Sequence, residues 1–169
     1  MIRYQTEKEN INWEQVAEVL RRSGLSDHSA QEQETAFRNS YATVFVYDDE
    51  KIVGVARAIS DGVFQAAIYN VALDPEYQGE GVGREMIHRL IAQLPGQNVI
   101  LYTHPQTVLL YEKLGFRRAK TAMEYFQMDP DKLEWMEQEG FFMKENYRFP
   151  EEIGRKDMQG PAWKDQKRR

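Results

Sequence analysis

The chain has 169 residues, a length that suits a single domain with one hydrophobic core. Its hydrophobic content of 41% and charged content of 29% are ordinary for a globular protein, and no apolar run is long enough to cross a bilayer. The absence of cysteine excludes disulfides, thiolate metal sites and a cysteine nucleophile. The net charge of −5 argues against nucleic-acid binding, because phosphate backbones are met by basic surfaces.

Charge is distributed unevenly along the chain. Residues 141–169 hold eight Lys or Arg and five Asp or Glu, a balance of +3, so the other 140 residues carry −8. The basic end is expected to be a solvated tail. The first residues, MIRYQTEKEN, lack a charged segment followed by an apolar one, so we expect no secretory signal and a cytoplasmic protein.

The first part of the chain is predicted to contain two helices and three strands. Apolar residues recur at helical spacing between residues 12 and 23, and Gly24 ends that helix. A second helix begins at Ser29. The strands are expected at residues 1–5, 42–47 and 51–60, the last two as a hairpin.

The middle of the chain alternates strands and helices. Asp74 and Pro75 close a strand at residues 64–73, and a helix at residues 83–94 follows a cluster of glycines. Beyond it we expect a strand at residues 98–103, a short helix at 106–115 and a final strand pair at 116–119 and 122–128. The alternation of strand and helix predicts parallel crossovers in an α/β domain.

The end of the chain differs in character. Residues 131–140 are predicted to form one more helix, and the segment after them mixes aromatic and charged residues without a clear period. We therefore expect one domain over residues 1–128 and a C-terminal extension over residues 129–169. That extension either wraps the core or contacts a second subunit, which leaves a homodimer open.

The glycine cluster is the stretch QGEGVG at residues 78–83, between a strand and a helix. The first N–H groups of a helix lack intrahelical partners, and glycines let the backbone approach an anion with positive φ angles. A tight turn without a ligand is the alternative. The stretch lacks the Gly-Lys-Ser/Thr of a P-loop, and Met86 stands where the dinucleotide fingerprint requires glycine.

A third pattern fits this stretch. Gln78, Gly81 and Gly83 match Q/R-x-x-G-x-G/A, so the stretch resembles the pyrophosphate-binding loop of the GNAT N-acetyltransferase superfamily. YEKLGF at residues 111–116 resembles the tyrosine-bearing segment near the end of that fold, 33 residues after Gln78. The resemblance covers roughly residues 2–128. Within the superfamily, the chain is most similar to the branch of serotonin and arylalkylamine N-acetyltransferases.

The resemblance implies a central mixed sheet, flanked by helices, in which the fourth and fifth strands splay apart. The pantetheine arm of acetyl-CoA would lie in that gap, and its pyrophosphate would rest on backbone amides of the glycine loop. This is how an acidic protein could hold a polyanion. The implied cofactor-binding residues are Val71, Ala72, Leu73, Gln78, Gly79, Glu80, Gly81, Val82, Gly83, Arg84 and His104.

Two of these residues have an alternative role that does not involve the cofactor. Arg84 could add a charge contact to the cofactor or be a solvated residue of a helix surface. His104 stands where many relatives have an asparagine that contacts the cofactor, and it could make that contact or cap the strand. His28 and His88 have no ligand partner at suitable spacing, so no metal site is expected.

Acetyl transfer needs a neutral amine, a donor to the tetrahedral oxyanion and a proton for the leaving thiolate. The family's equivalent of Tyr111 points at the thioester sulfur, and a phenol with a pKa of about 10 can protonate a departing thiolate. Tyr111 is therefore the expected general acid, with packing of its helix on the sheet as the alternative. An N–H near Val71 could stabilise the oxyanion.

The general base stays open. Asn70 occupies a position at which the similar branch commonly has aspartate, and an amide cannot act as a base, so Asn70 could only orient a water or the amine. Asp61 and Tyr69 are the alternatives, although Asp61 is expected to be a turn residue before Gly62.

Three hypotheses for the function follow. The first is an acetyl-CoA-dependent transferase for a small primary amine, an arylalkylamine or polyamine, with Tyr69, Tyr125 and Phe126 near the acceptor. The second is a protein-lysine or N-terminal acetyltransferase. The third is a CoA-binding sensor or assembly module without turnover, which Asn70 keeps open.

Overall fold

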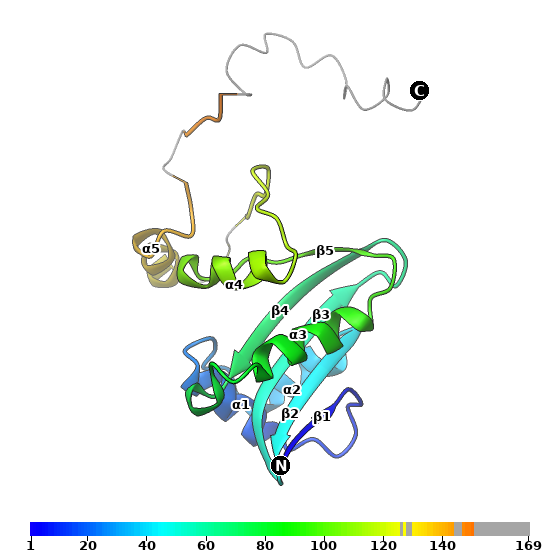
Figure 1. Cartoon of the computed structure of the whole chain (residues 1–169). Helices are drawn as coiled ribbons and strands as arrows, with labels where there is room; N and C mark the ends of the chain where they lie inside the picture. Colours follow the sequence, from blue (N-terminus) through cyan, green and yellow to red (C-terminus); the bar gives the residue numbers. More distant parts are fainter. Residues whose placement is uncertain (126, 128–129, 144–146, 151–169) are drawn as a thin grey trace. The chain divides into compact units, whose positions relative to one another are not determined.

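The computed structural model describes residues 1–125, 127, 130–143 and 147–150. These residues belong to two compact units, coloured along the sequence in Figure 1. The first unit contains Met1–Thr103 and Lys113–Gly115, and the second contains His104–Glu112 and residues from Phe116 onward.

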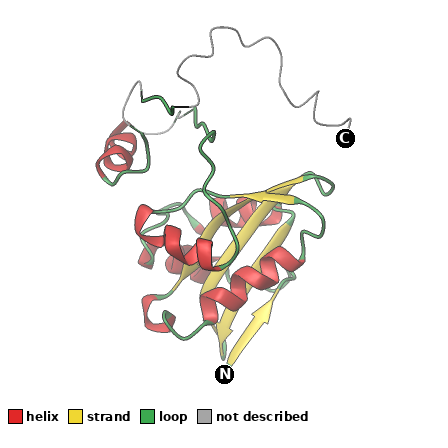
Figure 2. Ribbon diagram, turned by 45° about the horizontal axis from the view of Figure 1, so that its top comes forward, coloured by secondary structure: helices red, strands yellow, loops and turns green. Residues whose placement is uncertain are grey.

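Within the described residues, the first unit is built on a five-stranded sheet in the order β1-β2-β3-β4-β5 (Figure 2). Strands β1 to β4 pair in antiparallel fashion, whereas β5 pairs with β4 in parallel. The strands are β1 (Ile2–Gln5), β2 (Ala42–Asp48), β3 (Lys51–Ser60), β4 (Gln65–Leu73) and β5 (Asn98–Ile100). This mixed sheet with flanking helices confirms the predicted fold class.

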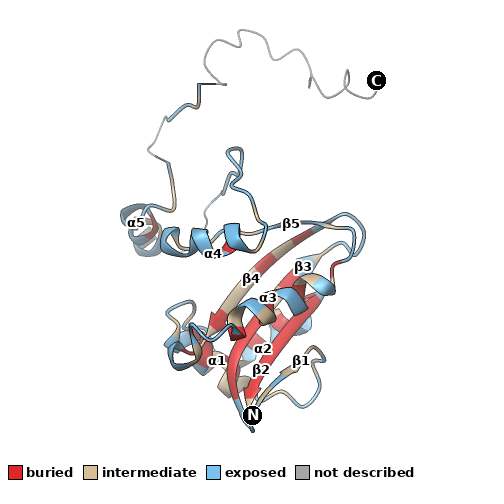
Figure 3. Ribbon diagram, in the orientation of Figure 1, coloured by how far each residue is buried: buried red, intermediate tan, exposed pale blue. Residues whose placement is uncertain are grey.

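Helices cover both faces of the sheet. α1 (Trp13–Arg22) and α2 (Ala30–Arg38) lie on one face, and α3 (Val82–Ala92) lies on the other (Figure 1). Because both faces are covered, β2 and β3 are buried along most of their length (Figure 3).

Side-chain caps define where the first two helices begin. Asn12 accepts a hydrogen bond from the amide of Gln15 at the start of α1. At the start of α2, Ser29 and Glu32 form a reciprocal capping box, which satisfies two amides that otherwise lack a partner. The predicted starts of both helices are therefore confirmed.

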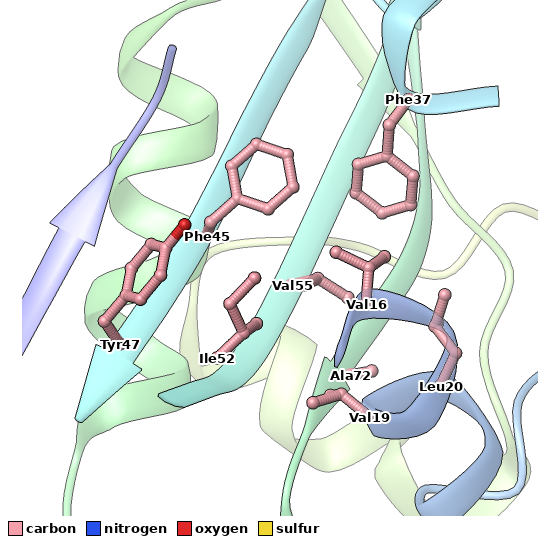
Figure 4. Packing of buried hydrophobic residues seen from close by; sticks show 9 residues of the cluster. All are labelled: Val16, Val19, Leu20, Phe37, Phe45, Tyr47, Ile52, Val55 and Ala72. Carbon is pink, nitrogen blue, oxygen red and sulfur yellow. The ribbon is translucent and has the colours of Figure 1, made fainter. Parts of the chain in front are cut away.

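The core between the sheet and the first two helices is made of aliphatic and aromatic side chains (Figure 4). Trp13 packs against its edge, with its ring centroid 6.2 Å from Phe37 and 5.9 Å from Phe45. The buried members are Val16, Val19, Leu20, Phe37, Phe45, Tyr47, Ile52, Val55 and Ala72. This core joins both helices to β2, β3 and β4.

The second unit contains most of α4 (Val108–Lys113), which follows the 3₁₀ turn η2 (Pro105–Thr107), and α5 (Pro130–Gln138). The ring of Phe141 lies 5.4 Å from His104 and 5.6 Å from Trp135. Met136 of α5 is buried. No described helix of either unit has the length and apolar character that a membrane span requires.

Two sequence predictions differ from the structure. The strand expected at residues 98–103 is confined to Asn98–Ile100, because its pairing with β4 ends there. The final strand pair is absent from the described residues 116–125 and 127, where Ala119–Tyr125 are exposed. The helix expected at residues 106–115 is shorter, as α4. The division at residue 128 stays a prediction.

Candidate functional site

Strands β4 and β5 separate after a short parallel ladder. They pair only between Gln65–Ala67 and Asn98–Ile100, whereas β4 continues to Leu73. In the described part of the chain, the edge of β4 from Ile68 to Leu73 therefore has no strand partner on the β5 side. This edge carries Val71, Ala72 and Leu73, which the sequence places beside the cofactor. An open parallel edge offers backbone groups to an extended ligand.

A β-bulge lies in the middle of this edge. Val55 pairs with Ala72 and Arg57 pairs with Tyr69, so β4 carries one more residue than β3 between these pairs. Asn70 sits in the bulge with a φ of 51°, a left-handed conformation that asparagine tolerates better than most residues. The bulge therefore places Asn70, the predicted site residue, at the point where β4 stands alone.

Arg57 of β3 is bound directly to this bulge. Its Nε donates to Oδ1 of Asn70 at 2.6 Å, and its Nη1 lies 3.3 Å from the hydroxyl oxygen of Ser40. Because a guanidinium can only donate, the contact fixes Oδ1 as the acceptor and leaves the amide nitrogen of Asn70 as a donor. Burial lowers the pKa of Arg57 from its ordinary value, the direction expected for a partly desolvated cation.

Arg57 is a site residue that none of the sequence motifs predicted. One signal could have found it, since it is the one charged residue in the otherwise apolar stretch IVGVARAI at residues 52–59. A charge inside a buried strand needs partners and is uncommon without a role.

Aromatic rings line the same part of the sheet. Tyr69 of β4 and Tyr102 after β5 form an edge-to-face pair with ring centroids 6.2 Å apart. The guanidinium of Arg57 lies 5.4 Å from the ring centroid of Tyr69. The first unit thus gathers Arg57, Tyr69, Asn70 and Tyr102 where β4 and β5 separate.

The glycine loop follows β4 after the 3₁₀ turn η1 (Pro75–Tyr77). Gly79 and Gly81 both have a φ of 87°, and Gly81 is the N-cap of α3 without a side-chain hydrogen bond. Among the described residues, none accepts a hydrogen bond from the amides of residues 79–84. This row of free N–H groups at a helix N-terminus is suited to a pyrophosphate.

The predicted polar side chains of the loop differ in placement. Nε2 of Gln78 donates to the carbonyl oxygen of Leu73 at 3.2 Å and so ties the loop to the end of β4. Glu80 and Arg84 are exposed, and Arg84 forms no ion pair with a described residue. The backbone of Gly79–Arg84 and the free guanidinium of Arg84 therefore fit a bound anion, whereas Gln78 shapes the loop.

Asp74 anchors the junction between β4 and the loop. Its side chain is buried, its amide donates to the carbonyl oxygen of Val53, and its Oδ2 lies 2.7 Å from Arg22 and 3.5 Å from Lys51. These ion pairs connect the end of β4 to α1 and β3. The position at which the loop begins is therefore held by the core of the first unit.

Asp61 acts as a turn residue in the β3–β4 hairpin. Its carboxylate accepts hydrogen bonds from the amides of Val63, Phe64 and Gln65. These bonds lower the pKa of Asp61 from its ordinary value. The turn role expected for Asp61 is confirmed, and a carboxylate engaged in this way is a poor proton acceptor.

Tyr111 and His104 belong to the second unit. Tyr111 is 8% exposed and its ring meets that of Phe116 edge to face at 5.7 Å. His104 caps η2, since its Nδ1 accepts from the amide of Gln106, and its Nε2 lies 3.2 Å from a carboxylate oxygen of Glu139. Both ring nitrogens of His104 are thus engaged within the unit, a partnership that the sequence did not predict.

The remaining predicted residues lie near the end of the described chain. Tyr125 is 87% exposed, and Phe126 lies outside the described residues. No group of three His, Cys, Asp or Glu residues in the described part of the chain is arranged to hold a metal ion.

Residues 9–116 match the model of the acetyltransferase (GNAT) family. The uncharacterized N-acetyltransferase ycf52 of Pyropia yezoensis is 32% identical over 120 residues, which cover 67% of this chain and 69% of the relative. The chloroplastic serotonin N-acetyltransferase 2 of Oryza sativa is 40% identical over 87 residues, 50% of this chain and 38% of that protein. A GNAT-family acetyltransferase of Streptococcus pneumoniae has the same fold, with a TM-score of 0.65 and 19% identity over 77% of this chain and 99% of that one.

Proposed function

The chain belongs to the acetyltransferase (GNAT) family and is an N-acetyltransferase, and from this premise we propose that it acetylates the primary amine of a small molecule. The family uses acetyl-CoA as the acetyl donor. One observation carries the proposal: the free amides of residues 79–84 follow the open edge of β4 in the same unit. Together they suit a ligand with a diphosphate at one end and an extended arm at the other.

We propose that the transfer is direct, within a complex of protein, acetyl-CoA and amine. The chain has no cysteine that could carry the acetyl group as a thioester. In the direct reaction the amine nitrogen attacks the thioester carbonyl, the C–N bond forms and the C–S bond breaks. The loop amides and the β4 edge would hold the donor, so the chain contributes mainly orientation.

The residues of β4 would act at the reacting carbonyl. An N–H near Val71 would donate to the oxyanion of the tetrahedral intermediate. Asn70 keeps its amide nitrogen as a donor because Arg57 occupies its oxygen, so it would orient a water or the acceptor and would not remove a proton. We leave the general base unassigned, since the turn amides engage the carboxylate of Asp61.

Tyr111 is proposed to protonate the departing thiolate. Its position four residues before Gly115 in YEKLGF matches the tyrosine-bearing segment of the family. The rings of Tyr69 and Tyr102 at the strand separation favour an acceptor with an apolar or aromatic body. Acetylation of protein lysines or N-termini is the alternative, and the test below distinguishes it from acetylation of a small amine.

The proposal is tested by following CoA release with a thiol-reactive dye. The dye reports only CoA, because the chain itself has no thiol. The acceptors would be aromatic amines, polyamines and peptides with a free N-terminus or lysine, at a fixed concentration of acetyl-CoA. Turnover of a small amine supports the proposal. Turnover of peptides alone would replace it with protein acetylation, and calorimetric binding of acetyl-CoA without turnover would favour a binding module.

Replacing Tyr111 by phenylalanine tests the general acid. We expect kcat to fall by about two orders of magnitude, because proton donation to the leaving group is lost, with the calorimetric Kd for acetyl-CoA nearly unchanged. Tyr147→Phe is the matched control, since Tyr147 is an exposed tyrosine. An unchanged kcat in Tyr111→Phe would leave Tyr111 as a packing residue.

A further inference from the structure

Arg57 is a half-buried cation without an acidic partner. Within the described residues it forms no ion pair, and the two side chains that accept its hydrogen bonds, Asn70 and Ser40, are both neutral. A second cation approaches the same place, because Lys8 donates to the carbonyl oxygens of Ser40 and Arg38. A buried charge of this kind is costly unless an opposite charge meets it.

The guanidinium is held in a fixed position. It lies 6.0 Å from the ring centroid of Phe37, which is fully buried, and 5.4 Å from that of Tyr69. With its Nε bound to Asn70, the side chain is fixed by the core on one side and by the bulge on the other. Such a preorganised fork loses little entropy when it binds a ligand.

Part of the fork remains free. A guanidinium carries five N–H donors, and Nη2 of Arg57 donates no hydrogen bond to a described residue. Nη2 also keeps contact with solvent, because Arg57 is only half-buried and Nη2 is not among the fully buried side-chain nitrogen and oxygen atoms of the described residues that lack a hydrogen bond. The outer end of the guanidinium is therefore available to an anion.

We propose that the acceptor carries a carboxylate close to its amine and that Arg57 binds this carboxylate. This inference rests on the proposed small-molecule acetyltransferase. A planar guanidinium matches a carboxylate in a bidentate manner, with two parallel hydrogen bonds. Arg57 touches Asn70 directly, so a carboxylate on its outer end would lie next to the bulge, in the part of β4 that has no β5 partner. The short spacing of amine and carboxylate in an amino acid suits such a place.

The same charge argues against one of the acceptor classes considered from the sequence. A polyamine would bring several positive charges to Arg57 and Lys8, and like charges repel. The rings of Tyr69 and Tyr102 lie beside the cation and suit an aromatic body. Aromatic amino acids combine both features and are the acceptors that we expect.

The test compares matched acceptors that differ only in the carboxylate: phenylalanine with phenethylamine, and tryptophan with tryptamine. Wild-type kcat/KM should favour the amino acid of each pair by at least about tenfold, because hydrogen bonds to a charged group are stronger than those to a neutral group. Arg57→Gln should abolish that preference, because kcat/KM should fall by at least about tenfold more for the amino acid than for the carboxylate-free amine of each pair. Arg21→Gln is the control, because Arg21 is an exposed arginine paired with Glu18.

A second variant tests the charge without removing Arg57. Asn70→Asp places a carboxylate against the guanidinium of Arg57. The resulting internal ion pair should neutralise the charge of Arg57 and so also abolish the preference for the amino acid. Equal losses of kcat/KM for both members of each pair in Arg57→Gln would overturn the inference, because Arg57 would then only position Asn70. A preference for O-phosphoethanolamine over the amino acids would overturn it as well.

Failure of the proposed function is distinguishable from failure of this inference. If CoA is released with none of the acceptors, the proposed function fails. The carboxylate site is then tested by ligand binding without turnover. A thermal shift in the presence of CoA that is larger for phenylalanine than for phenethylamine in the wild type, and equal for both in Arg57→Gln, supports the site. Equal shifts in the wild type overturn it.

Discussion

Gly81 and Gly83 belong to the same loop but have different conformational needs. Gly81 has a φ of 87°, in the left-handed region that an L side chain adopts only at a cost, although a Cβ there would meet nothing within 4 Å. Gly83 has no positive φ, and a Cβ there would only touch Leu73 at 3.6 Å, an ordinary contact. The geometry therefore requires glycine at residue 81 and accepts alanine at residue 83, as the family pattern allows.

Gly81→Ala and Gly83→Ala should therefore behave differently. We expect Gly81→Ala to lose about 1–2 kcal/mol of stability, because its backbone is left-handed, and to bind acetyl-CoA more weakly as the loop amides are re-aimed. Gly83→Ala should keep both the melting temperature and the Kd within small changes. Calorimetric titration with acetyl-CoA and thermal unfolding of both variants provide the measurements. Equal Kd values for the two would show that the left-handed backbone at residue 81 does not matter for binding.

At the scale of the element, contacts at the two ends of β4 fix the position of the strand that carries the site residues. Its first residues are set by the β3–β4 hairpin, in which Asp61 accepts hydrogen bonds from three successive amides. Its last residue is followed by the buried Asp74, and the bulge at Asn70 lies between the two ends. β4 thus pairs with β3 on both sides of the bulge, while it loses β5 after Ala67.

The hairpin gives a pH-dependent contribution to stability. Hydrogen bonds from the turn amides hold the pKa of Asp61 below its ordinary value of 3.8 in the folded chain. The stabilisation is therefore present above pH 3.8 and is lost as the pH falls through the lowered pKa. Asp61→Asn should lower the melting temperature at neutral pH, and the difference from the wild type should shrink toward acidic pH. A difference that is constant from pH 7 to about pH 3 would contradict this role of the charge.

At the scale of the whole molecule, the aromatic cluster holds the first unit together. Phe37 of α2 and Phe45 of β2 have ring centroids 5.6 Å apart, and Trp13 of α1 lies against both. Phe37 also lies beneath the guanidinium of Arg57, so the packing of the helices on the sheet and the position of the site depend on the same side chain.

Phe37→Ala should therefore destabilise the first unit strongly. Removing a fully buried phenylalanine costs about 3–5 kcal/mol, which corresponds to a fall in melting temperature of roughly 6–20 °C for a chain of this size. Phe64→Ala is the matched control, because Phe64 is 69% exposed and its loss should have little effect. Thermal unfolding followed by circular dichroism measures both variants. Similar melting temperatures for the two would mean that the cluster has relaxed to fill the cavity.

Local patterns in the sequence were sufficient for the helix starts, the hairpin, the end of β4 and the glycine loop. The caps at Asn12 and Ser29, the turn at Asp61 and the sequence QGEGVG act through neighbouring residues, so their spacing carries the information. Because the loop motif depends on backbone conformation over a few residues, it also revealed the family.

The contacts of Asn70 and the secondary structure of residues 101–125 could not be predicted from local patterns, because both depend on contacts between distant segments. Arg57 and Asn70 are brought together by strand register, and a bulge of one residue changes which side chains meet. The same dependence explains the overestimated strand at residues 98–103, since apolar character alone does not say where a neighbouring strand ends. The identity of the acceptor belongs with these long-range features, because its charge is recognised by a cation whose surroundings exist only after folding.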